Sequence, residues 1–148
     1  MDASQNAFAY SRLQVAKTFC AHIDGPSEAT FLVVAARPPS AALRDALGKA
    51  ALALGWEDGP TFVSCDAPSA LSKAEFFELV EGLDPLRLVL ADDAACARAT
   101  EAYGDTILPQ TALHLFGRPT CAFFDLDSLL GSEAGKQQAW TLLKTLAR

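Results

Sequence analysis

Two pairs of aspartates are the residues best suited to chemistry: Asp92-Asp93 and, directly after two phenylalanines, Asp125-Leu126-Asp127. Paired carboxylates can serve as general acid and base, or can bind a hard divalent cation through their oxygens. Each pair also lies in front of a segment with helical spacing, where carboxylates accept hydrogen bonds from free helix amides. Capping is the favoured interpretation, in which Asp127 and Ser128 cap local turns while Asp125 is solvated. Cation binding is the alternative, and no metal site is assigned.

Few other residues have the neighbours that a reaction requires. Arg37 lies in an Ala-Ala-Arg-Pro-Pro loop, where a guanidinium can bind phosphate or carboxylate, although a surface arginine is the simpler interpretation. No serine, cysteine or lysine lies in a recognisable nucleophile motif. The cysteines lack CxxC spacing and lie among apolar residues, so we expect reduced, buried thiols at Cys20, Cys65, Cys96 and Cys121. No cofactor is predicted.

The elements that position these residues alternate along the chain. Apolar, β-branched runs over 30–36, 61–65 and 86–91 predict strands buried on both faces, and helical spacing follows each of them. Ser40 and the capping-box spacing of Ser72 and Glu75 predict helix starts, and Gly104 predicts a helix end. Two strand pieces around Gly117-Arg118-Pro119 lead to a last helix that begins near Ser132. The alternation predicts an α/β fold, a three-layer α/β/α sandwich with a central, mainly parallel four-stranded sheet. Ligands bind such sheets beyond the carboxyl ends of the strands, which places both aspartate pairs at the expected ligand edge.

Composition limits the remaining possibilities. The chain has 148 residues, of which 51% are hydrophobic, so we expect one domain over 1–148, with residues 1–24 as an N-terminal helical extension. Apolar runs are short, and the N-terminus does not resemble a signal peptide; a cytoplasmic location without membrane contact is therefore expected. The net charge of −6 and the scattered basic residues disfavour tight nucleic-acid binding.

Four segments carry a family resemblance. They read FLVVAARPP from residue 31, LVLADDAACARATEAYG from residue 88, GRPTCAFFDLDSLL from residue 117 and KQQAWTLLKTL from residue 136. In this order and spacing they resemble the uracil-DNA glycosylase superfamily, especially its short bacterial members. The resemblance covers residues 30–148 and is most specific at Gly117-Arg118-Pro119, Leu129-Leu130 and Ala139-Trp140. It implies the sandwich fold and places the positions equivalent to catalytic motifs at Ala36, Pro38, Asp125 and Asp127.

The sequence departs from this family where its chemistry resides. The family's base-reading asparagine corresponds to a position near Thr61, whose hydroxyl cannot offer the paired donor and acceptor of an amide. Asp125 stands in place of a histidine that donates to the leaving base, and an ionised aspartate opposes the developing negative charge. Ser40 leads almost at once into a helix, so the segment that stacks on a flipped base is missing.

The resemblance therefore implies a retained fold without base excision. We expect a binding or interaction module whose partner is a protein or a small molecule. The psi subunit of bacterial DNA polymerase III is similar in fold to these glycosylases and acts as an assembly part. The alternative is a divergent enzyme that acts on a nucleobase, a nucleotide or uracil-containing DNA through the acidic loops. The candidate ligand-binding residues are Arg37, Thr61, Asp92, Asp93 and Ser128.

Overall fold

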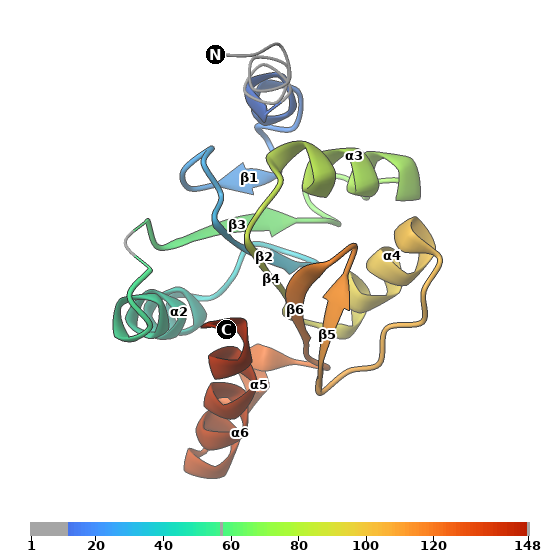
Figure 1. The fold of residues 1–148 in the computed structure, drawn as a ribbon. Coiled ribbons are helices and arrows are strands. Elements are labelled where there is room, and N and C mark those ends of the chain that lie inside the picture. Colours follow the sequence, from blue (N-terminus) through green and yellow to red (C-terminus); the bar gives the residue numbers. More distant parts are fainter. Residues whose placement is uncertain (1–11, 57, 148) are drawn as a thin grey trace.

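The computed structural model describes residues 12–56 and 58–147. Its centre is a six-stranded mixed sheet in the order β1-β3-β2-β4-β6-β5 (Figure 1). Four strands form parallel pairs, β3 with β2, β2 with β4 and β4 with β6, whereas β1 and β5 are antiparallel edge strands. The strands are β1 (Ile23–Asp24), β2 (Phe31–Ala35), β3 (Pro60–Ser64), β4 (Arg87–Leu90), β5 (Thr111–Leu115) and β6 (Arg118–Ala122).

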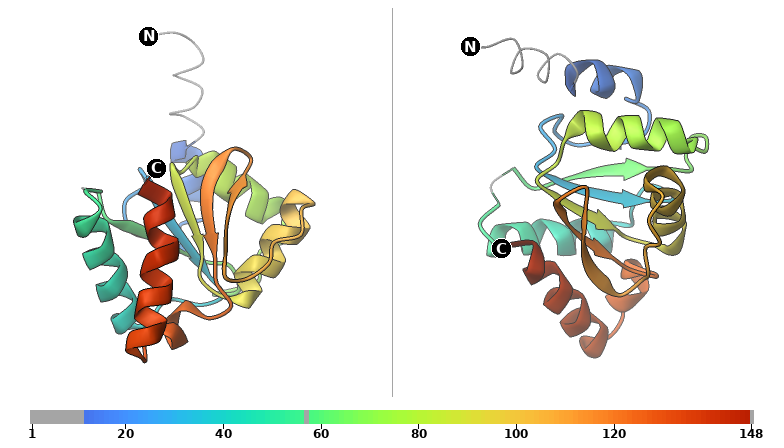
Figure 2. Two further views of the ribbon diagram at one scale, coloured as in Figure 1. Left: turned by 60° about the horizontal axis from the view of Figure 1, so that its bottom comes forward. Right: turned by 45° about the vertical axis from the view of Figure 1, so that its right-hand side comes forward.

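Helices cover both faces of this sheet (Figure 2). Helices α3 and α4, with the helical residues 12–18, enclose one apolar cluster, to which Leu32 and Val34 of β2 contribute. Helices α2, α5 and α6 enclose the other, to which Phe31 and Val33 contribute. Every residue of β2 is buried, which explains its uninterrupted apolar run. The helices are α2 (Ala41–Ala53), α3 (Lys73–Leu83), α4 (Asp93–Tyr103), α5 (Leu126–Leu129), α6 (Glu133–Leu143) and the 3-10 helix η1 (Lys144–Ala147).

The helix boundaries follow local capping signals in the sequence. The Ser40 side chain accepts a hydrogen bond from the Leu43 amide at the start of α2. Ser72 and Glu75 form the expected capping box at the start of α3. Gly104 ends α4 in the left-handed conformation with φ of 75°. These predicted helix ends are confirmed.

Two parts of the sequence-based fold need correction. The sheet has six strands rather than four, because the region around Gly117 turns back into a β5–β6 hairpin and because Ile23–Asp24 pair with β3. That short strand lies within the predicted helical extension, whose residues 1–11 fall outside the described residues. The described helix ends at Thr18, and the following turn leaves Cys20 exposed rather than buried.

Among the described helices, none combines the length and the apolar character needed to cross a membrane.

Candidate functional site

The carboxyl ends of β2 and β4 meet at the switch point of the sheet. The chain leaves β2 for β3 on one side and then crosses to β4 on the other, which is where open α/β sheets bind ligands. Here one carboxylate joins the loop that follows β2 to the loop that follows β4. Asp92 Oδ2 accepts a hydrogen bond from the Ala36 amide at 2.9 Å, and Oδ1 accepts one from the Ala95 amide at 2.8 Å. The Ala36 amide is thus bound to the protein's own carboxylate.

The loop after β6 closes on the same edge. The Asp93 amide donates to the Phe124 carbonyl at 2.8 Å, and the Leu126 amide donates to the Ala91 carbonyl at 2.9 Å. Asp92 and Asp125 form an isolated antiparallel bridge between the two loops. Backbone pairing therefore holds the two acidic segments together, as their positions after neighbouring strands predict.

Each carboxylate of the second aspartate pair has a partner within the protein. Asp125 caps α5: its Oδ1 accepts from the Ser128 amide at 3.2 Å, and its Oδ2 accepts from the Ser128 hydroxyl at 2.7 Å. Asp127 Oδ1 accepts from the Ser40 hydroxyl at 2.9 Å. Asp125 rather than Asp127 is the capping residue, and Ser128 donates to that cap instead of forming one.

The other candidate residues lie in two places. Arg37 and Pro38 are exposed in the loop after β2, beside the half-buried Ala36. Thr61 lies near the amino end of β3, opposite Leu32, and its buried hydroxyl donates to the Pro26 carbonyl at 2.8 Å. The structure therefore brings Ala36 and the four aspartates to one edge and leaves Thr61 away from them.

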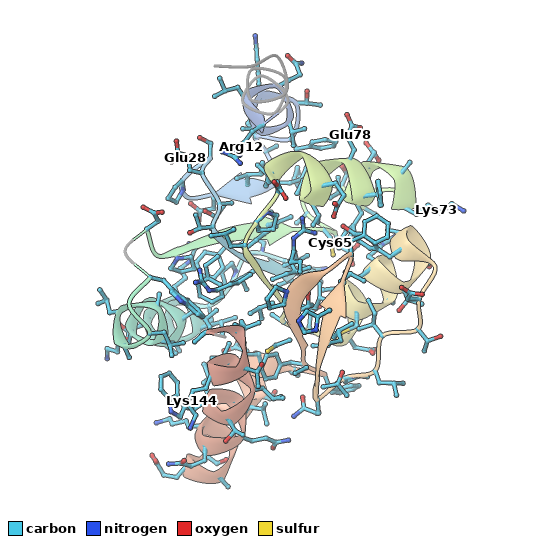
Figure 3. All side chains as sticks on the ribbon, viewed as in Figure 1. Arg12, Glu28, Cys65, Lys73, Glu78 and Lys144 are labelled. Carbon is cyan, nitrogen blue, oxygen red and sulfur yellow. The ribbon has the colours of Figure 1, made fainter. Side chains whose placement is uncertain are left out.

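Two buried thiols flank the acidic edge. Burial, followed by the Asp66 and Asp92 carboxylates, raises the pKa of Cys65 to about 12. Burial, followed by Asp93 and Asp92, raises the pKa of Cys96 to about 11. Figure 3 shows Cys65 in the interior of the molecule. Both thiols stay protonated at neutral pH and are poor nucleophiles and poor metal ligands.

The four aspartates do not form a recognisable metal site. Within residues 12–56 and 58–147, no group of three or more His, Cys, Asp or Glu side chains is arranged to hold a metal ion. The carboxylates of Asp92, Asp125 and Asp127 accept hydrogen bonds from amides and hydroxyls instead. The geometry favours the capping interpretation over cation binding.

A second polar cluster lies at the opposite end of the sheet and centres on Arg118, whose side chain is only 7% exposed. It donates to the Pro85 carbonyl at 2.8 Å, to Glu81 at 2.7 Å and to Asp84 at 3.1 Å. The Tyr103 hydroxyl donates to the same Glu81 oxygen, and burial with Glu81 raises the pKa of Tyr103. In the sequence, Arg118 stands out only as part of the Gly117-Arg118-Pro119 motif, and no local pattern indicates its acidic partners.

An apolar groove of about 550 Å³ lies between α2 and α6, which run side by side in Figure 2. Small side chains of α2 form one wall, and Leu130 and Trp140 contribute to the other. Lys49 and Lys136 come from opposite sides. The alanines that line the groove follow one another at helical spacing: Ala42, Ala46, Ala50 and Ala53. In the sequence this spacing is the one sign of the groove, but it equally predicts close packing against the core.

The sequence matches no protein-family model and no curated protein.

Proposed function

We propose that this chain is a non-catalytic binding module on a uracil-DNA glycosylase-like fold and that it does not excise bases. The observation that carries the proposal is the Asp92 carboxylate bound to the Ala36 amide at the switch point of the sheet. An amide in that loop is a natural donor to an anionic ligand or a catalytic water. Here the donor is already occupied by a negative group that would repel either a phosphate or a departing base.

The second support is the arrangement of Asp125 and Asp127. Asp125 occupies the position that, by the family resemblance, corresponds to the histidine that donates to the leaving base. Its two carboxylate oxygens accept hydrogen bonds from Ser128. A carboxylate in this position adds negative charge where negative charge would develop, so it opposes base departure. The acidic edge also lacks the positive electrostatic potential that attracts DNA phosphates. The same contacts speak against the alternative of an enzyme acting through these acidic loops.

The test is single-turnover release of uracil from single-stranded and double-stranded DNA, with the protein in large excess over DNA. We expect no release above a control without protein, while an active uracil-DNA glycosylase releases uracil under the same conditions. Release that is abolished by Asp125→Ala and retained by Asp93→Ala would overturn the proposal. It would mean that an aspartate performs the role expected of the histidine.

The α2–α6 groove supports a second candidate function, the binding of a small apolar carboxylate. Its volume lies within the range of about 300–1,000 Å³ typical of small-molecule sites, and its lining is mostly apolar. Among residues 12–56 and 58–147, the ion-pair partner of Lys136 is the exposed Glu133 alone, at 3.5 Å, so its ammonium remains able to meet a carboxylate at the rim. Lys49 instead has Asp45 at 3.0 Å as its partner.

A medium-chain fatty acid such as decanoate is a suitable probe, because Trp140 lies in the groove and reports on binding through its fluorescence. Ala46→Phe places a ring in the groove and should abolish the fluorescence change. Ala41→Phe is the matched control, because Ala41 is exposed on the same helix and does not line the groove. Unchanged tryptophan fluorescence at saturating decanoate, or equal binding by both variants, would exclude this candidate.

A further inference from the structure

The two edges of the sheet are protected very differently. At one edge, β1 contains only two residues, and such a short strand presents few free backbone hydrogen-bonding groups to another chain. At the other edge, β5 contains five residues, and no strand of the described chain pairs with its outer side. Figure 1 shows β5 at the margin of the sheet beside β6. The β5 edge is the one that could accept a further strand.

The register identifies the backbone groups that face outward. The Phe123 amide donates to the Leu90 carbonyl, so residue 123 points toward β4, and alternation directs Ala122 and Thr120 toward β5. Their antiparallel partners, Thr111 and Leu113, therefore point inward to β6. The intervening residues of β5 present their amides and carbonyls to solvent, and their side chains are exposed; they are Ala112 and His114.

This edge lacks the usual devices that prevent strand addition. Thr-Ala-Leu-His-Leu contains no lysine, no proline and no acidic residue. Three large apolar side chains flank it with more than half of their surface exposed: Leu108 at 63%, Phe116 at 61% and Phe124 at 61%. Phe116 is held in place by edge-on contacts with Tyr103 and Phe77, whose ring centroids lie 5.0 and 5.6 Å away. An exposed strand edge bordered by fixed apolar groups is characteristic of an interface.

We propose that β5 pairs antiparallel with the β5 of a second copy of this chain, joining the two six-stranded sheets into one. A two-fold axis at Leu113 is self-complementary, because it places Ala112 opposite the partner's His114 and His114 opposite the partner's Ala112. Both residues have outward-facing amides and carbonyls, so this register forms four interchain hydrogen bonds. It brings no two acidic or lysine side chains of β5 together.

The antiparallel arrangement also pairs the apolar flanks. Phe116 follows β5, and Leu108 precedes it, so the Phe116 end of one strand lies beside the Leu108 end of the partner strand. The same contact occurs twice around the axis, as expected for an isologous interface. A second copy therefore covers exposed apolar side chains at both ends of the strand. Dimerisation through β5 is independent of what binds at the carboxyl edge or in the α2–α6 groove.

Sedimentation velocity on the full chain, from low to high micromolar concentration, tests the pairing. We expect a monomer–dimer equilibrium in the unchanged protein. Ala112→Pro removes the outward amide in both copies, and with it two of the four interchain bonds, which should weaken dimerisation by about 10- to 100-fold. The monomer should stay folded, because this amide does not bond to β6 and proline is tolerated on an edge strand.

Leu108→Ser provides a second variant that leaves the strand backbone intact, and it should weaken the dimer by about tenfold. Leu52→Ser is its matched control, because Leu52 is 76% exposed on α2, away from β5. Amide exchange needs no variant: protection of Ala112 and His114 should rise with protein concentration, while that of Leu113 stays constant. A monomer at all concentrations with fast exchange at both amides would overturn the proposal. A dimer that persists unchanged in folded Ala112→Pro would also overturn it.

Discussion

The two ends of the sheet use acidic side chains in different ways. At the carboxyl end, Asp92 and Asp125 accept hydrogen bonds from amides and a hydroxyl, and they retain contact with solvent. At the amino end, Glu81 and Asp84 hold Arg118, whose side chain is almost fully buried. At the carboxyl end, the carboxylates cap helices and hold neighbouring loops together. At the amino end, a buried guanidinium is stabilised by several hydrogen-bond acceptors at once.

In both clusters, the charged groups that make these hydrogen bonds support the fold. A buried guanidinium without partners is very costly, so Glu81 and the Pro85 carbonyl are committed to Arg118. The capping carboxylates at the carboxyl end could bind a ligand only by giving up their amides. We infer that the hydrogen-bonded charges of neither cluster are free to bind a ligand, which leaves the α2–α6 groove and the β5 edge as the candidate binding surfaces.

Removing the buried cation should have the largest effect. Arg118→Met leaves the Glu81 carboxylate and the Pro85 carbonyl without their donor, and we expect the free energy of unfolding to fall by about 3–5 kcal/mol. Arg44→Met is the control, because its ion pair with Asp24 is exposed at 38% and 62%, and its loss should cost about 0–1 kcal/mol. Urea denaturation of both variants measures the difference. Equal losses would mean that burial does not distinguish Arg118.

The next largest effect should come from the residue that joins two loops at the carboxyl end. Asp92→Ala removes the α4 cap and the partner of the Ala36 amide, and we expect a loss of about 2 kcal/mol. Asp93→Ala alters the neighbouring, exposed carboxylate and should cost less than about 1 kcal/mol. Denaturant titration with amide exchange at Ala36 measures both effects. Unchanged exchange at Ala36 in Asp92→Ala would contradict the bridging role.

Much of the fold could be predicted because its signals are local. The buried strands β2, β3 and β4 are short apolar runs, and the helix starts at Ser40 and Ser72 carry their own capping residues. Strand β1 could not be predicted, because Ile23 and Asp24 have no periodic pattern and become a strand only by pairing with β3. The hairpin was visible as two pieces, but only the turn at Phe116 and Gly117, with φ of 52° and 77°, makes them separate strands.

The sequence predicts where the candidate site lies in the fold, but not which of its residues are hydrogen-bonded to one another. Strand ends place the aspartates at one edge, whereas the bond from Ala36 to Asp92 joins residues 56 apart and depends on the register of β2 and β4. Thr61 was assigned through the family resemblance, and register places it near the amino end of β3. The groove depends on the distance between α2 and α6, which alanine spacing does not determine.

A smaller effect is expected from the cap of the short helix α5. Asp125→Ala removes the acceptor for both Ser128 donors, and we expect a loss of about 1 kcal/mol. Asp127→Ala removes only the exposed contact with Ser40 and should cost about 0.5 kcal/mol or less. Thermal denaturation resolves the order of the two variants. A greater loss for Asp127→Ala would assign the main structural role to the Ser40 contact.

The buried thiols give an effect that is absent at neutral pH and grows in alkali. Folding raises the pKa of Cys65 from 9.0 to about 12, and burial raises the pKa of Cys96 and of Cys121 to about 11. The folded protein therefore keeps protons that the unfolded chain loses above about pH 9. Their contribution to stability is complete below that pH and decreases as the pH rises through 11 to 12.

Thiol labelling of the native protein at pH 8 should therefore modify Cys20 alone, while the denatured chain reacts at all four cysteines. Cys20→Ser should abolish native labelling, which makes it the control for accidental opening of the core. Asp92 raises the pKa of Cys65 and Cys96, but burial is the larger cause for both. Asp92→Ala should consequently leave both thiols unreactive in the folded state. Rapid labelling of Cys65 in that variant would show that the carboxylate, by holding the two loops together, is what keeps this edge of the sheet closed.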